Sequence, residues 1–462
     1  MPKVLLNNLQ AYVESLVEKH QVPAASLAVW HNNQLYRAAA GILNRETGVA
    51  ATPDSIFQIG SITKVFTASL VMQLVDEGRV ELDRPVKHYV PDFQIADPSA
   101  TKTITVRQLL NHTNGMMGDF FPDDAHAEGN LIARYVDRCN LLPQIHPPGA
   151  LYSYSNAAFA IAGRLIEVVS GVSWFTSVED RIFKPLAMQT AVARPTEVLR
   201  YSTAMGHVLN SEASEKWCLA DECYLTLGQA PAGSTLMMSA SDLIKFAKAH
   251  LYQGQTESGS SWLSSSAANQ MQESQFHLPP LSGVFDQFVG IGWGKSVFKQ
   301  GGTTMISHNG ATLGFESMLR LIPELNLAFA ILVNGVEPGV MANIGGELMT
   351  ALTGINLKEP EPAERAAQGT DLDQFTGRYE SFNSVYTVTL NDDQLVATLL
   401  YKIDPVPALK LNLIPIGEGV FATYGEDDQR LANIAFIFDK TSETPRYLFA
   451  EGRLNIHSQG SI

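Results

Sequence analysis

The chain has 462 residues, more than one ordinary hydrophobic core can hold, so we expect at least two domains. Its 32 Lys and Arg residues against 47 Asp and Glu residues give a net charge of −15 with no offsetting basic cluster, which excludes nucleic acid as a partner. The hydrophobic share of 45% indicates a globular protein, and no uncharged apolar run reaches the roughly 18 residues of a membrane span.

The cysteines and the N-terminus point to a reducing compartment. Cys139, Cys218 and Cys223 are odd in number and lack metal-ligand spacing, so we expect neither a disulfide framework nor a metal site. Residues 1–20 have the pattern of an amphipathic helix and lack the apolar stretch and small-residue cleavage site of a signal peptide. We therefore expect a cytoplasmic protein.

In chain order, the N-terminal helix is followed by a hairpin and then by a largely helical region. Strands at 25–30 and 34–38 flank a polar turn, which predicts the hairpin. Residues 61–77 are apolar on almost all sides, as in a helix buried inside a domain. Further helices are expected at 105–110, 131–141, 156–169 and 241–251.

Strands then return before a last helix at 342–352. They are expected at 290–294, 303–308, 315–322 and 327–333, the last two joined by a Pro-Glu-Leu-Asn turn. Because strands open and close this region, the simplest assembly is one antiparallel sheet built from both ends. The expected class is α+β, with an antiparallel sheet flanked by helices and a helical region inserted into it.

The last hundred residues have a different pattern. Residues 356–369 are charged and contain prolines, as is typical of a linker. Beyond them, short alternating runs separated by turn clusters predict a small all-β barrel. We divide the chain into a first domain at 1–357, a linker at 358–370 and a barrel domain at 371–462.

The candidate nucleophile is Ser61. It lies three residues before Lys64 at the start of the apolar helix, so both side chains share one face and the amine can take the hydroxyl proton. The spacing alone favours an ordinary helix cap with a solvated lysine, because S-x-x-K also occurs at Ser99 and Ser296. Other motifs must therefore distinguish Ser61 from the other two.

Two motifs that occur once in the chain supply this support. Tyr154 and Asn156 lie in a turn before a strong helix, where a phenol can relay a proton and an amide can hold a carbonyl. Alternatively, Asn156 is a helix cap and Tyr154 a packed aromatic. His308 and Gly310 lie at a strand end, where the glycine would let a substrate backbone approach closely. A lone histidine at such a position is more often structural.

Several other chemistries are excluded by missing motifs. The sequence has no G-x-S-x-G elbow and no H-E-x-x-H, which argues against an α/β-hydrolase and a zinc protease. The glycines at 290, 292 and 294 do not open a helix, so they are not a dinucleotide-binding signal.

Together, the three motifs resemble those of the serine β-lactamase and penicillin-binding-protein superfamily, in its class C β-lactamase-like branch of esterases, D-amino-acid peptidases and acyl transferases. The stretches Leu109–Gly115 and Ala230–Ser234 are also similar to this branch, and the resemblance covers about residues 9–352. The tail resembles the lipocalin-like domain appended to some of these hydrolases.

The resemblance implies a role for each residue. Ser61 would attack a carbonyl, and Lys64 and Tyr154 would share the general-base role, with Tyr154 later protonating the leaving group. Asn156 would position the substrate. The backbone N–H groups of Ser61 and Ala311 would form the oxyanion hole, and no metal or cofactor would be needed.

The strand motif departs from the usual pattern in an informative way. Classical β-lactamases and penicillin-binding proteins have a lysine where this chain has His308. By this resemblance we count His308 as catalytic and Gly310 as substrate-binding. Because a histidine with a pKa of about 6.5 is mostly neutral at pH 7, recognition of a β-lactam carboxylate should be weakened. Esters, amides or small peptides become the expected substrates.

We therefore expect a cytoplasmic serine hydrolase acting on a small-molecule or peptide acyl substrate, with no membrane partner. Three alternatives stay open: an acyl transferase or peptide-cyclising thioesterase using the same acyl-enzyme, a non-catalytic binding protein on the same fold, and a barrel that binds a lipid-like ligand. The sequence does not indicate the oligomeric state.

Overall fold

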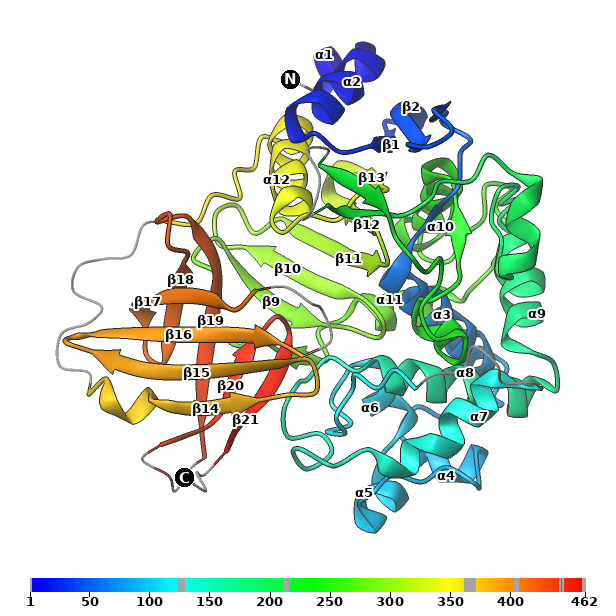
Figure 1. The fold of residues 1–462 in the computed structure, drawn as a ribbon. Helices are drawn as coiled ribbons and strands as arrows, with labels where there is room; N and C mark the ends of the chain where they lie inside the picture. Colours follow the sequence, from blue (N-terminus) through cyan, green and yellow to red (C-terminus); the bar gives the residue numbers. More distant parts are fainter. Residues whose placement is uncertain are drawn as a thin grey trace.

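The computed structural model describes residues 2–122, 129–210, 216–360, 371–402, 407–439, 442 and 444–458. A large region of helices and sheet lies beside a smaller barrel (Figure 1). This confirms the α+β class with an antiparallel sheet and a C-terminal all-β barrel. The proposed domain boundaries stay predictions, since most of the linker at 358–370 lies outside the described residues.

The N-terminal segment forms two helices where one was predicted. α1 (Pro2–Asn7) and α2 (Leu9–His20) meet at Asn8, whose backbone at φ −122° and ψ 30° is not helical. Leu9, Val13 and Leu16 lie on one face of α2 and are buried. Together with α12 (Val340–Thr353), this face covers the outer side of the sheet.

Among the described residues, nine strands form the sheet in the order β3-β2-β1-β13-β12-β11-β10-β9-β8. β1 (Ala24–His31) pairs antiparallel with both β2 (Gln34–Asn44) and β13 (Leu327–Val333). The first and last long strands of the region are therefore neighbours. This agrees with the expectation of one sheet built from strands at both ends of the region. The others are β3 (Val49–Ala50), β8 (Phe276–His277), β9 (Phe285–Val289), β10 (Gly294–Phe298), β11 (Thr304–Thr312) and β12 (Phe315–Ile322).

Helices pack on the inner face of this sheet, with α3 (Thr63–Asp76) at their centre (Figure 1). Residues 63–74 of α3 are all buried, as its all-round apolar pattern predicts. Phe66 stacks on Phe246 of α10 (Ala240–Leu251) with ring centroids 3.7 Å apart. The remaining helices described in this region are α4 (Val86–Tyr89), α5 (Pro98–Thr103), α6 (Val106–Leu110), α7 (Leu131–Arg138), α8 (Asn156–Ser170), α9 (Trp174–Val178) and α11 (Ser265–Gln272).

The predicted strand at 290–294 is wrong for its first four residues. Residues 290–293 instead link β9 to β10 and pass under the helices, where the Gly292 N–H donates to the Leu110 carbonyl at 2.9 Å. A Cβ at Gly292 would lie 2.7 Å from the Ala68 Cβ on α3, so the glycine allows the close packing. Two short ribbons complete the region: β4 (Phe57–Gln58) with β7 (Met237–Met238), and β5 (His207–Leu209) with β6 (Trp217–Leu219).

The C-terminal strands close into a barrel in which, over the described residues, β14 to β21 follow in chain order and β21 pairs with β14. Two strands, β14 and β17, were missed by sequence reasoning. The interior is one cluster of buried apolar side chains that includes Phe375, Phe421 and Phe436. The strands are β14 (Gly377–Glu380), β15 (Ser384–Asn391), β16 (Gln394–Tyr401), β17 (Leu409–Gly417), β18 (Val420–Tyr424), β19 (Arg430–Phe438), β20 (Pro445–Ala450) and β21 (Arg453–Ser458).

The barrel packs against the first region through β20 and β21 (Figure 1). The Tyr447 hydroxyl donates to the Ile145 carbonyl at 2.8 Å, and the pair is buried. Around it, Phe449 and Leu454 of the barrel pack on Tyr152 of the first region. The contact is therefore an apolar interface with at least one buried hydrogen bond at its centre.

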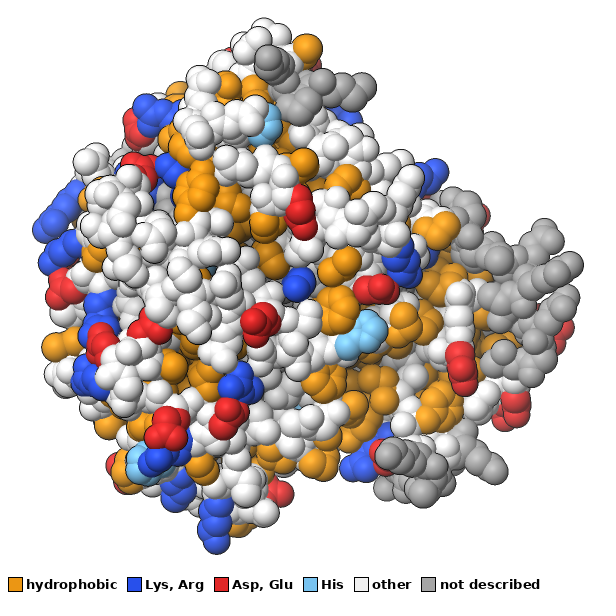
Figure 2. All heavy atoms as spheres, turned by 180° about the vertical axis from the view of Figure 1, so that it is seen from behind, with side chains coloured by type: hydrophobic (Ala, Val, Ile, Leu, Met, Phe, Trp, Pro, Cys, Tyr) orange, Lys and Arg blue, Asp and Glu red, His pale blue; other side chains and the backbone are white. Residues whose placement is uncertain are grey.

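The surface carries mixed charge. On the face shown in Figure 2, Lys and Arg side chains lie among Asp and Glu side chains. Taken over the described residues, no single helix has both the length and the apolar composition of a membrane span; α8 and Trp174–Phe183 meet these criteria only as a pair bent by 82°.

Removing the Tyr447 hydroxyl tests the docking of the barrel. The Tyr447→Phe variant leaves the Ile145 carbonyl buried without its donor, so we expect the free energy of unfolding to fall by about 1–3 kcal/mol. Urea unfolding followed by fluorescence measures this. Tyr424 lies on a barrel strand, and its hydroxyl has no hydrogen-bond partner among the described residues, so Tyr424→Phe should change the value by less than about 0.5 kcal/mol. Equal effects in both variants would contradict the assignment.

Candidate active site

Ser61 lies in a short 3-10 turn, Gly60–Ile62, that leads directly into α3. Gly60 has φ +51°, and a Cβ there would lie 2.6 Å from the backbone nitrogen of Ala311 on β11. Glycine at this position therefore lets the turn press against the strand. The consequence is that Ser61 stands between the central helix and the end of the sheet.

Lys64 lies next to the Ser61 hydroxyl. Its Nζ donates to Ser61 Oγ at 3.0 Å and to the Ala232 carbonyl at 2.6 Å. The side chain is fully buried. Burial holds the pKa of Lys64 well below the usual value of a lysine, although the Asp119 carboxylate acts in the opposite direction. A neutral amine beside a hydroxyl can accept its proton.

The other two S-x-x-K pairs lack this environment. Ser99 and Lys102 are both exposed on α5. Ser296 lies on β10, where residues three apart do not share a face. Burial and neighbours therefore distinguish Ser61 from the other copies, which the spacing could not.

Tyr154 completes the centre of the site. Its side chain and that of Ser61 line the same hollow, and the Lys64 Nζ lies 4.8 Å from the centroid of its ring. Burial raises the pKa of Tyr154 above the usual value of a phenol, while the nearby Ser61 side chain lowers it. The hydroxyl, the amine and the phenol thus form one contiguous group.

His112 was named in the sequence only as part of a family-like stretch, and no role was given to it. Its ring stacks on Tyr154 with centroids 4.4 Å apart, and its Nδ1 accepts from the Ser155 N–H at 3.0 Å. Burial lowers the pKa of His112 well below its ordinary value, so the ring is neutral. His112 therefore holds Tyr154 in place without adding charge.

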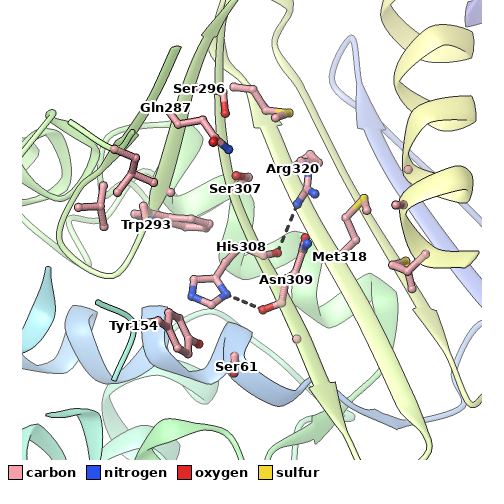
Figure 3. Close-up of a pocket in the computed structure, with 18 of the residues that line it drawn as sticks. Ser61, Tyr154, Gln287, Trp293, Ser296, Ser307, His308, Asn309, Met318 and Arg320 are labelled. Carbon is pink, nitrogen blue, oxygen red and sulfur yellow. Dashed lines mark hydrogen bonds between the residues drawn. The ribbon is translucent and has the colours of Figure 1, made fainter. Parts of the chain in front are cut away.

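β11 brings the third motif to the site, and Figure 3 shows His308 on this strand above Tyr154 and Ser61. The His308 Nδ1 donates to the Asn309 carbonyl at 2.6 Å. Burial, reinforced by Lys64, lowers the pKa of His308 to about 3. The ring is therefore neutral at pH 7, as the sequence predicts.

Gly310 has a different neighbour from the one expected. A Cβ there would lie 2.0 Å from the Ile59 carbonyl oxygen, which also accepts a hydrogen bond from Ser317 at 2.8 Å. The close approach is thus made by the chain's own backbone before Ser61. Gly310 sets the distance between the serine turn and β11, and so the position of the Ala311 N–H.

Asn156 is the first residue of α8, with Ser155 as its cap, and its amide donates to Asp119 Oδ1 at 2.6 Å. Asp119 was not predicted. Nor were Asn383 and Arg453 of the barrel, which bind the same carboxylate. No periodicity or motif marks these three residues, because only the folded chain brings the loop and the barrel together.

Ser61 opens into two hollows. One, of about 780 Å³, runs along β11 and is lined by Tyr154 and His308 (Figure 3). The other, of about 1010 Å³, is lined by Asn156 and by Tyr401 of the barrel. Ser61, Ala311, Glu451 and Arg453 line both. The barrel therefore forms part of the wall around the candidate nucleophile.

The chain is similar to several known proteins. The family model described as "Beta-lactamase" matches residues 9–352. "Penicillin-binding protein 4" of Amycolatopsis lactamdurans is 35% identical over 380 residues, which are 80% of this chain and 96% of that protein. The crystal structure of SurE has a TM-score of 0.78 at 26% identity and covers 99% of this chain and 100% of its own. A D-stereospecific amidohydrolase from Streptomyces sp. has a TM-score of 0.56 at 26% identity, over 75% of this chain and 98% of its own.

Fold and comparisons together define a serine hydrolase of the penicillin-binding-protein type. The chain belongs to the β-lactamase family, with a closed β-barrel added at its C-terminus.

The Gly310→Ala variant tests the packing of β11 on the serine turn. The new Cβ would overlap the Ile59 carbonyl, so β11 must shift and the Ala311 N–H leaves its position. We expect kcat to fall by about 10²–10³-fold, as for the loss of one oxyanion donor. Steady-state kinetics on an activated ester measures this, and Gly417→Ala, whose Cβ would meet only ordinary contacts in the barrel, serves as control. Full activity of Gly310→Ala would refute the explanation.

Proposed function

We propose that the protein cleaves an ester or amide bond through an acyl-enzyme formed on Ser61. The observation that carries this proposal is the 3.0 Å contact between the Ser61 hydroxyl and the buried Lys64 amine. A buried amine with a lowered pKa is a base at neutral pH, and a base beside a hydroxyl makes it a nucleophile.

The residues support a sequence of steps. Ser61 Oγ attacks the carbonyl carbon, and its proton passes to the coupled Lys64–Tyr154 pair. The N–H groups of Ser61 and Ala311 stabilise the oxyanion. The intermediate collapses as Tyr154 returns the proton to the leaving group. Water then attacks the acyl-enzyme, gives a proton to the same pair and regenerates Ser61, so every proton is accounted for by protein groups.

The charge around His308 indicates the substrate class. The neutral imidazole of His308 carries no positive charge, unlike the lysine that the resemblance to classical β-lactamases leads one to expect at this position. Neutral esters and amides, or peptides, are therefore favoured over β-lactams with their carboxylate. The name of the D-stereospecific amidohydrolase and the D-Leu complex of SurE add support for an acyl donor with a D-configured residue.

A second candidate function is acyl transfer to an amine, including cyclisation of a peptide. It is favoured by the second hollow beside Ser61, which leaves room for a nucleophile other than water next to the acyl group. Adding an amine acceptor to a reaction with a D-aminoacyl ester separates the two functions. Acceptor-dependent amide product favours transfer, and free acid alone favours hydrolysis.

Covalent labelling tests the nucleophile. A fluorophosphonate should add one equivalent to the protein, observed as a mass increase, because the reagent reacts with an activated serine. The Ser61→Ala variant should show no adduct, and Ser99→Ala should label like the parent protein. An adduct of equal size on Ser61→Ala would rule out Ser61 as the nucleophile.

Replacing His308 tests the substrate preference. In His308→Lys a permanent positive charge faces the hollow, so kcat/KM for nitrocefin should rise relative to a neutral p-nitrophenyl ester by about tenfold, equivalent to about 1.4 kcal/mol. The ratio of the two substrates cancels any general change in the Lys64–Tyr154 pair. His308→Gln, which is neutral, should leave the ratio close to that of the parent protein. A ratio that does not change in His308→Lys would refute the charge argument.

A further inference from the structure

One buried carboxylate connects the barrel to the catalytic residues. Asp119, on the loop after α6, is 4% exposed. It accepts from Asn156 at 2.6 Å and from Asn383 at 2.8 Å, and it forms an ion pair with Arg453 through two nitrogens of the guanidinium. Asn383 and Arg453 both belong to the barrel, so a single group holds the site residue and the barrel together.

The turn between β20 and β21 makes a second contact with the site. The Gly452 carbonyl accepts from the Tyr154 N–H at 2.9 Å, and the next residue, Arg453, places its guanidinium 5.0 Å from the centroid of the Tyr154 ring. Arg453 Nη1 also donates to the Glu451 carbonyl at 3.0 Å, which fixes the guanidinium in the turn. The barrel thus contacts Tyr154 by backbone and Asn156 through Asp119.

The opposite charges of Asp119 and Arg453 balance each other near Lys64. The titratable groups that act on or near Lys64 come from several elements: Tyr154, His112, His308, Asp119 and Arg453. Both histidines are held neutral by burial and Tyr154 is a phenol. Of the charged side chains, Asp119 and Arg453 act on Lys64 itself, whereas Arg320 acts on His308 and Glu451 acts on Arg453. Their effects on Lys64 are opposite: the carboxylate raises its pKa and the guanidinium lowers it.

We propose that the barrel is part of the catalytic machinery, and that Arg453 is a positioning residue whose charge, paired with that of Asp119, acts on the Lys64–Tyr154 pair. Arg453 cancels the charge of Asp119 beside the Lys64–Tyr154 pair and holds Asp119 where it orients the Asn156 amide. The proposal rests on the proposed function of the Lys64–Tyr154 pair as the base for Ser61. It assigns to the barrel an electrostatic role in the reaction itself.

The two partners should have opposite effects when removed singly. Without Arg453, the uncompensated Asp119 carboxylate makes the Lys64–Tyr154 pair hold its proton more tightly. The acidic limb of the kcat–pH profile therefore moves to higher pH. Without the Asp119 charge, the uncompensated guanidinium makes the Lys64–Tyr154 pair lose its proton more readily, so the acidic limb moves to lower pH. Each shift should be about one pH unit. Removing both charges should return the limb to near its original position.

The experiment uses the full chain with Arg453→Met, Asp119→Asn and the double variant. Profiles of kcat against pH, with a neutral p-nitrophenyl ester and at constant ionic strength, should show the upward, downward and restored limbs. Arg378→Met removes an exposed arginine of β14 that pairs with Glu380, and its profile should match the parent protein. Limbs that stay in place, or that move in the same direction in both single variants, would overturn the proposal.

Two more variants keep the test decisive if Arg453→Met does not fold. Arg453→Lys retains the charge and should keep the limb in place. Asn383→Ala removes an uncharged barrel contact to Asp119 and should raise KM while leaving the limb in place. A moved limb in either variant would overturn the electrostatic role. Fluorophosphonate labelling of the parent protein is independent of these outcomes: absence of an adduct on Ser61 would refute the proposed function itself.

Discussion

The site depends on keeping the Lys64 ammonium out of water. The amine is buried between the Ser61 hydroxyl and the Ala232 carbonyl, at the start of a helix whose first twelve residues are all covered. Desolvation penalises the charged form, so the neutral amine is favoured and can act as a base. The rings of Tyr154 and Phe159 lie 4.8 and 5.9 Å from the same nitrogen and help to cover it.

Glycines set the geometry around this buried amine. Gly60, Gly233 and Gly310 each allow a backbone approach that a Cβ would block, and the three meet at the turn that carries Ser61. A Cβ at Gly233 would lie 2.9 Å from the Ser61 nitrogen, so the absence of a side chain there leaves that N–H accessible. The nucleophile and its oxyanion donors are therefore positioned by main chain packed on main chain, which is stiffer than a contact between side chains.

The sequence predicts the fold well where hydrophobic periodicity carries the signal, as in α3, α8 and the hairpin of β12 and β13. It predicts Ser61, Tyr154 and His308 because each lies in a short motif. It misses Asp119, Asn383 and Arg453, since these residues acquire a common role only when the barrel docks on a loop 264 or more positions away. It also misses the strand β17, whose Pro415 and Gly417 disturb the alternating pattern and mark a bulge in the structure.

The barrel closes by pairing its last strand with its first, β21 with β14. The same strand begins with Arg453, the residue that meets Asp119. Arg453 therefore reaches its place only when the strand that closes the barrel has paired with β14. A chain whose sheet and helices are folded still lacks part of the surroundings of Ser61 until this closure. On the proposed role of Arg453, the closure of the barrel and the full reactivity of Ser61 are thus acquired together.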